Sequence, residues 1–270
     1  MTNENSFQTF TFKLNTKYKS LDINLNKNEF NNIYVNEILI SELKSIFYWC
    51  QLHLEISTIY ISSDSDFTFK GLNPNNIENQ QLSDLIVLNQ SLEKLITFSK
   101  QLPQTIIMDI SLGAENIGIE FSLLADLLIS HQDCKLKFNF LSQGLAPRSG
   151  AISILSCMLS PAHVKNWILG DMIVEQSDLL AIGHISSTYN SKTKSTMLEK
   201  LLFNISKQSS ICRVQTKLAF YEIIKEELIK KYNKEKTFSN AALSIGDWKN
   251  CNKKTNLNDV KGFLKEEFHN

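Results

Sequence analysis

The residue with the clearest capacity for chemistry is Glu120, which lies in the stretch Gly113–Asp126, "GAENIGIEFSLLAD". The first half of this stretch has the composition of a loop, and the second half that of a buried, almost wholly apolar helix. A carboxylate near the start of such a helix can act as a general acid or base in a water-poor pocket, or it can cap the helix or pair with a lysine. Burial raises the pKa of a carboxyl group and a helix N-terminus lowers it, so the sequence leaves both roles open.

Composition argues against several other classes of function. The five cysteines form no CxxC pair and the five histidines are dispersed, so we expect no metal site and a reducing, cytoplasmic location. Lys+Arg and Asp+Glu both number 28, which leaves no basic excess for binding nucleic acid. The N-terminus does not resemble a signal peptide, and no apolar run reaches ~18 residues, so we expect no membrane contact.

The elements that must position Glu120 follow from the hydrophobic pattern. With 270 residues, 43% of them hydrophobic, the chain can form one large domain or a domain plus an appendage. Strands are expected at 6–26 (two strands), 57–63, 105–111 and 135–141, with a loop at 64–80. Helices are expected at 31–54, 82–102, from Pro161, at 175–182 before Gly183, and from 194 onward with a loop at 236–255. Strands that alternate with helices, followed by helices alone, indicate an α/β core with a helical C-terminal part.

Glu120 also belongs to a longer pattern of spacings. A glycine-rich loop leads into the helix of Glu120, which ends at Ala125-Asp126 before a strand, and Gly144 and Pro147 follow at set distances. This order and spacing resemble the signature of the crotonase (enoyl-CoA hydratase/isomerase) superfamily. Three flanking segments agree with the resemblance: 24–32, 60–73 and 168–186. The resemblance covers roughly residues 20–190 and extends weakly to "VKGFLKEEF" at 260–268.

The resemblance implies a spiral of ββα units followed by a helical region. Residues 1–193 would form the crotonase-like core with the acyl-thioester site. Residues 194–270 would form a helical region for trimerisation that adds part of the acyl-CoA pocket. The implied assembly is a homotrimer or a dimer of trimers, and the implied ligand is an acyl-CoA or an acyl chain on a carrier protein. Coenzyme A would be part of the substrate, and no separate cofactor is expected.

The resemblance also assigns roles to individual residues. Glu120 would be the acid/base, and Glu115 in the loop is a substitute second acid or a solvated residue. The backbone N–H groups of Lys70 and Ile117 would form an oxyanion hole, which stabilises the enolate oxygen by preorganised hydrogen bonds. Asp126 is expected to be an architectural hydrogen-bonding residue, and Arg148 can face either the acyl pocket or the surface. The substrate pocket would include Phe69, Gly71, Gly118, Phe140, Ser142 and Pro147.

Four departures from the family pattern bear on activity. Two of them are Lys70, at a position that normally carries a small residue, and a total of only nine glycines, so that bulkier residues fill several turns. Ile117 replaces the glycine whose amide faces the thioester, and a β-branched residue hinders close approach of the backbone. Phe140 stands at the position of the second acid of hydratases, where it continues the apolar face of Leu136 and Phe138 and is expected in the core. Hydration divides its proton transfers between two carboxylates, each contributing ~10²–10⁴-fold, so two-carboxylate hydration is disfavoured.

Three functions therefore remain. The first is an enzyme of fatty acid metabolism that acts on an acyl thioester through an oxyanion-stabilised enolate, as an isomerase or decarboxylase-like lyase or a weak hydratase. The second is a catalytically impaired crotonase homologue that serves as a binding or structural protein. The third, more remote, is a thioester hydrolase.

Overall fold

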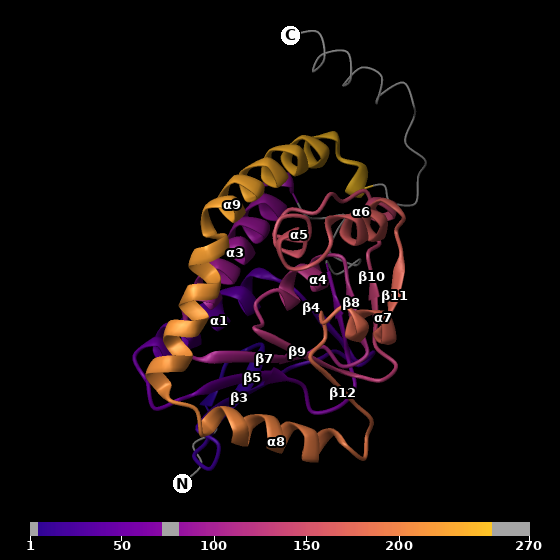
Figure 1. The fold of residues 1–270 in the computed structure, drawn as a ribbon. Coiled ribbons are helices and arrows are strands. Elements are labelled where there is room, and N and C mark those ends of the chain that lie inside the picture. Colours follow the sequence, from indigo (N-terminus) through magenta and orange to yellow (C-terminus); the bar gives the residue numbers. More distant parts are fainter. Residues whose placement is uncertain (1–4, 72–80, 250–270) are drawn as a thin grey trace.

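Two β-sheets form the framework of the computed structural model, which describes residues 5–71 and 81–249 (Figure 1). The larger sheet has the order β1-β2-β3-β5-β7-β9-β12 and the smaller one β11-β10-β8-β6-β4. The larger sheet comprises β1 (Asn5–Ser6), β2 (Phe10–Asn15), β3 (Ser20–Leu25), β5 (Thr58–Ser62), β7 (Thr105–Asp109), β9 (Leu127–His131) and β12 (Ser187–Tyr189). The smaller sheet comprises β4 (Asn32–Tyr34), β6 (Thr68–Lys70), β8 (Gly113–Glu115), β10 (Lys135–Lys137) and β11 (Ile173–Glu175). The segment 260–268 lies outside the described residues.

The chain passes from one sheet to the other in every turn. Each of β3, β5 and β7 is followed by a strand of the smaller sheet, β4, β6 and β8, and then by a helix. Parallel pairing joins successive turns within both sheets, while β1, β2 and β3 open the larger sheet as antiparallel strands. The topology is therefore a spiral of ββα units, as the resemblance implied.

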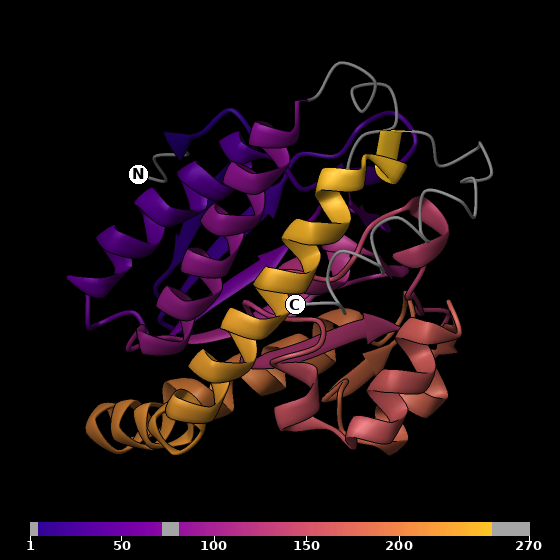
Figure 2. The same cartoon turned by 90° about the horizontal axis from the view of Figure 1, so that it is seen from above.

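The helices surround this framework. They are α1 (Glu37–Gln51), α3 (Leu82–Gln101), α4 (Ile117–Ser122), α5 (Leu155–Met158), α6 (Pro161–Leu169), α7 (Gln176–Ala181), α8 (Lys194–Ser206) and α9 (Ser210–Ile245), with 3₁₀ turns η1 (Leu141–Gln143) and η2 (Asp247–Lys249). Figure 2 shows α1 and α3 side by side, and the long α9 lies against α3. None of the helices in residues 5–71 and 81–249 combines the length and apolar character that a membrane crossing requires.

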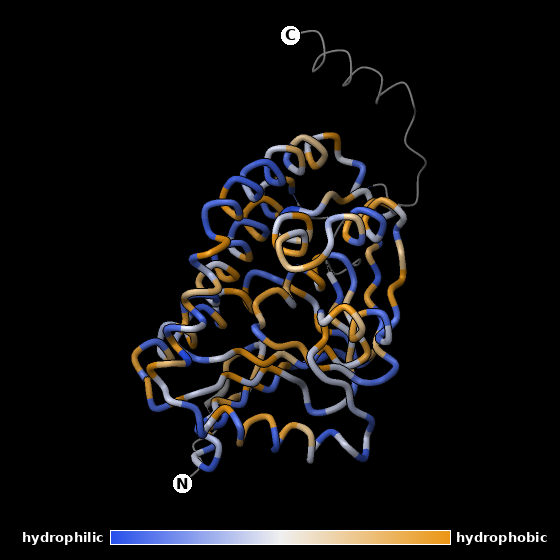
Figure 3. Tube along the Cα trace, viewed as in Figure 1, coloured by the Kyte–Doolittle hydropathy of each residue, from blue (hydrophilic) through white to orange (hydrophobic). Residues whose placement is uncertain are grey.

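Apolar side chains fill both faces of the larger sheet. The main core includes side chains of α1 and α3, and orange, hydrophobic stretches run along the strands (Figure 3). On the other face, Leu202 and Ile205 of α8 pack with Ile107 and Ile129 of the sheet. Burial of these side chains, at about 25 cal/mol per Å² of apolar surface, favours the layered arrangement.

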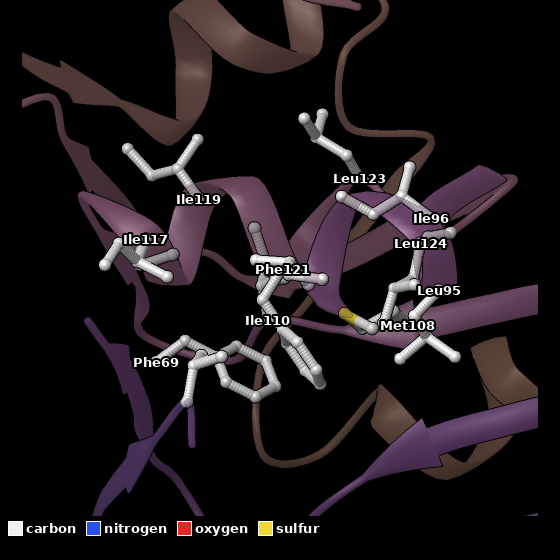
Figure 4. Packing of buried hydrophobic residues seen from close by; sticks show 14 of the residues in the cluster. Phe69, Leu95, Ile96, Met108, Ile110, Ile117, Ile119, Phe121, Leu123 and Leu124 are labelled. Carbon is white, nitrogen blue, oxygen red and sulfur yellow. The ribbon is translucent and has the colours of Figure 1, made fainter. Parts of the chain in front are cut away.

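The short helix α4 is buried along its whole length. All six of its residues are buried, and Figure 4 shows Ile117, Ile119 and Phe121 within the central cluster. The ring of Phe121 lies 5.2 Å from that of Phe69 in β6. At Gly118, an added Cβ would come within 2.5 Å of the carbonyl oxygen of Phe69, so only glycine permits this approach of α4 to β6.

Most predicted elements are confirmed, and several boundaries were wrong. The strand expected at 135–141 ends at Lys137, and Gly113–Glu115, expected to be loop, forms strand β8. The helix expected at 31–54 begins only at Glu37, because Asn32–Tyr34 pairs in parallel with Thr68–Lys70. That partner strand lies within the stretch 64–80 expected to be loop. The loop expected from 236 is wrong as far as 245, since α9 continues to Ile245 and ends at Gly246, whose φ is 83°.

Candidate active site

Glu120 is fully buried in α4 and is bound to a distant loop. Its Oε1 accepts hydrogen bonds from the backbone N–H groups of Arg148 at 2.8 Å, Ser149 at 2.7 Å and Ala151 at 3.4 Å. Its Oε2 has no hydrogen-bond partner among the described residues. The carboxyl group therefore does not cap its own helix or pair with a lysine there, and it connects α4 to the segment 148–151.

The surroundings of Glu120 favour its protonated form. Burial raises the pKa of its carboxyl group to about 8, the nearby charge of Glu235 adds to this effect, and the three amide hydrogen bonds oppose it. A group with this pKa retains a proton at neutral pH. Glu120 has the protonation state of a general acid, but the fraction of it exposed to solvent is 0%.

Glu115 lies in strand β8 rather than in a solvated loop. Its Oε1 is 2.6 Å from Nζ of Lys70 and 2.8 Å from Nζ of Lys137, which is its partner in the neighbouring strand. Burial alone would raise the pKa of Glu115, but the hydrogen bonds of Lys137 and Lys70 outweigh it and hold the pKa below its usual value. An ionised, doubly paired carboxylate of this kind is suited to joining strands.

The backbone N–H group of Ile117 is already hydrogen-bonded within its own turn. The side-chain Oδ1 of Asn116 accepts it at 2.6 Å, and Nδ2 of Asn116 donates to Gln143 at 2.8 Å. The same Oδ1 lies against Gly71, where an added Cβ would approach it to 1.6 Å. The carboxamide of Asn116 thus fills the space between Gly71 and the Ile117 amide.

Asn116 holds this position with a strained backbone. Its φ is 38° and its ψ is −114°, a conformation in the left-handed half of the map that favours glycine. Asparagine is among the non-glycine residues that enter positive φ most readily, because its short side chain bonds to the local backbone. The side-chain bond to Ile117 offsets part of this strain.

Comparisons with known proteins bear on the fold. No family model matches the sequence, and no curated protein matches it. An enoyl-CoA hydratase from Bacillus halodurans superposes with a TM-score of 0.80 at 17% identity, over 90% of this chain and 98% of that one. The chain has the crotonase fold. An enoyl-CoA hydratase/isomerase from Pseudoalteromonas atlantica T6c (TM-score 0.75, 15% identity, 96% and 98% covered) and an enoyl-CoA hydratase from Mycobacterium smegmatis (0.72, 14%, 98% and 100%) are similarly related.

Within the crotonase fold, the predicted site residues differ in their surroundings. Phe69, Gly71 and Gly118 are buried around α4, whereas Ser142 is exposed and its N–H donates to Asp171 at 2.8 Å. Phe140 is 1% exposed and lies in the core, as predicted. Pro147 lines a pocket of ≈ 330 Å³ between the segment 146–156 and α9. Lys70 directs its ammonium group to Glu115, and its carbonyl oxygen accepts the N–H of Val35 at 3.4 Å.

The sequence assigned no role to Asn116 or Glu235 and left the location of Arg148 open. Asn116 fills the predicted oxyanion hole, and its only signal was an asparagine in a glycine-rich turn. Arg148 is buried rather than on the surface, and its guanidinium has no hydrogen-bond partner among the described residues. Glu235 comes from α9 to the same loop as Glu120, and nothing marked it among the many charged residues of that helix. The described residues contain no cluster of His, Cys, Asp or Glu that could hold a metal ion.

Proposed function

We propose that this chain is a crotonase-fold protein with a closed acyl-thioester site, which acts by binding or as a structural component rather than by turnover. The observation that carries this proposal is the position of Asn116. Its Oδ1 accepts the Ile117 N–H at 2.6 Å and lies against Gly71, so the oxygen of a thioester carbonyl would have to displace it. An oxyanion hole stabilises charge only when its donors are free to face the developing oxyanion.

The acids of the site support the same proposal. Glu120 is buried and held by three backbone amides, and Glu115 is neutralised by two lysines. Phe140 supplies no second carboxylate. In this conformation a substrate would therefore find the carboxyl groups of Glu120 and Glu115 already bound, and the N–H group of Ile117 already hydrogen-bonded.

Turnover of a panel of 2-enoyl-CoA, 3-enoyl-CoA and malonyl-type thioesters tests the proposal, with Glu120→Gln as the matched control. We expect the wild-type chain to give no more product than Glu120→Gln with any member of the panel. A wild-type turnover rate that exceeds the Glu120→Gln rate by about tenfold or more would overturn the proposal.

A second candidate function is one-carboxylate chemistry on an acyl thioester, such as double-bond isomerisation or protonation of an enolate after decarboxylation. Two observations favour it: Glu120 retains a proton near neutral pH, and Asn116 is strained, which is typical of residues that move at functional sites. Coenzyme A or the carrier protein would be part of the thioester substrate, with no other cofactor. If this candidate is right, the wild-type chain turns over a thioester at a rate that depends on Glu120, and Asn116→Gly should increase that rate. The closed-site proposal expects no turnover by the wild-type chain. No observation favours the thioester hydrolase.

A further inference from the structure

Two buried carboxylates share the backbone N–H groups of one loop. Oε1 of Glu120 accepts those of residues 148, 149 and 151. Glu235 accepts the others, from Gly150 at 3.3 Å, Ile152 at 3.2 Å and Ser153 at 2.9 Å. Six consecutive N–H groups therefore converge on two side chains from α4 and α9, which are 115 positions apart in the sequence.

The loop conformation depends on Gly150. Its φ is 122°, and an added Cβ would come within 2.7 Å of Ile154 and 3.0 Å of the Tyr232 hydroxyl group. A glycine here lets successive N–H groups point to opposite sides, one set toward each acid. The Tyr232 hydroxyl, also from α9, donates to the carbonyl oxygen of Ser149 at 3.3 Å and fixes the same loop.

Six amide hydrogen bonds do not compensate the cost of burying two ionised carboxylates. Glu120 is 0% and Glu235 5% exposed, and two ionised carboxylates close together repel each other strongly away from water. Other charged or titratable groups lie around the pair. Arg148 belongs to the same loop, Glu93 of α3 pairs with Lys236 at 3.5 Å, Tyr232 of α9 faces both acids, and Lys231 and Lys234 line the same pocket as Glu235. The free-energy cost of burying a neutral carboxyl group with one unpaired oxygen is lower than the cost of burying a second charge.

We propose that Glu235 is the second acid of this site and a positioning residue: it shares one proton with Glu120, and the singly protonated pair holds the segment 148–153 between α4 and α9. Burial raises the pKa of both carboxyl groups, and the charge of Glu235 raises that of Glu120 further. Glu235 also borders the pocket that contains Pro147 and Phe238, which offers the pair a route for proton exchange with solvent.

The pair is tested on the full chain, without substrate, by infrared spectroscopy of the protonated carboxyl C=O band across a pH series. Glu120→Gln should remove the band that titrates near the pKa of about 8 in the wild type. Glu235→Gln should shift that titration to lower pH, because the neighbouring charge is gone. Glu227→Gln, on an exposed side chain of the same helix, is the control and should leave the band unchanged.

A second variant separates charge from reach. Glu235→Asp keeps the charge but shortens the side chain, so the titration should stay raised while amide hydrogen exchange in 148–153 becomes faster. If the titration of Glu120 is the same in Glu235→Gln as in the wild type, the acids do not share a proton and the proposal fails. If Glu235→Gln does not fold, the Glu235→Asp measurements decide: a lowered titration or unchanged exchange in 148–153 overturns it. Because none of these measurements uses a thioester, the proposal stands or falls independently of turnover.

Discussion

The carboxamide oxygen of Asn116 lies 2.6 Å from the backbone nitrogen of Ile117, the amide that the crotonase resemblance assigns to the oxyanion hole. The same carboxamide oxygen also lies against the backbone of Gly71, where it leaves no room for a Cβ atom. The N–H group of Ile117 thus has an internal acceptor, at the position where the resemblance places the oxygen of a thioester.

Replacement of Asn116 separates backbone strain from hydrogen bonding. Asn116→Gly and Asn116→Ala both lose the carboxamide, but only glycine adopts φ 38° and ψ −114° readily. We expect the glycine variant to be more stable than the alanine variant by about 1–2 kcal/mol, measured by urea unfolding. Equal stabilities would show that position 116 is not strained.

The stability of the chain should depend on pH through Glu120. Its pKa in the folded chain is about 8, above the ordinary value of 4.5, so between these values the folded chain keeps a proton that the unfolded chain loses. The free energy of unfolding should therefore fall as pH rises through this window, by about 1.4 kcal/mol per pH unit for one group. Glu120→Gln cannot ionise, so its stability relative to the wild type should increase over the same window. Urea unfolding of both at several pH values measures this difference, and a constant difference would contradict it.

Asp126 and Lys217 should form the ion pair that most stabilises the attachment of α9. Nζ of Lys217 lies 2.6 Å from Oδ2 of Asp126 and 2.7 Å from the carbonyl oxygen of Gln104, and its side chain is 10% exposed. Asp126 also accepts the N–H of Ile106 at 2.8 Å, the architectural role expected for it. Lys217→Met removes the ammonium group that is hydrogen-bonded to this carboxylate and should cost about 3 kcal/mol.

The matched control is Lys225→Met on the same helix. Lys225 pairs with Glu222 on the exposed surface, so its replacement should cause no measurable loss of stability. Equal losses in the two variants, by thermal or urea unfolding, would mean that the Lys217 pair has no special role.

The trimer implied by the crotonase resemblance remains a prediction. Large apolar side chains lie exposed on α9, which is consistent with a contact between copies: Ile211 75%, Phe220 72% and Ile223 80%. Light scattering should give the mass of a trimer or hexamer, and Phe220→Glu should reduce it toward that of the monomer. A monomeric wild-type chain would rule out this assembly.

The spiral of ββα units was predictable because local patterns and a family spacing agreed over most of the chain. Boundaries failed where a distant partner decides the structure. Asn32–Tyr34 reads as the start of a helix but pairs with Thr68–Lys70, and that pairing has no local signal. In α9, the buried positions include Glu235 and Ser239 besides apolar residues. The apolar period is therefore interrupted close to the point at which a loop was predicted.

The sequence by itself determined an α/β core and the place of Glu120 near the start of a buried helix, because apolar periodicity is a local property of the chain. The spiral of ββα units was implied by the resemblance to the crotonase superfamily. Only the tertiary structure decided the state of the site. It brought the side chain of Asn116 against Gly71, and Glu235 to the loop that Glu120 binds. Such contacts join residues with no pattern between them, and a buried carboxyl group takes its protonation from the neighbours that folding supplies.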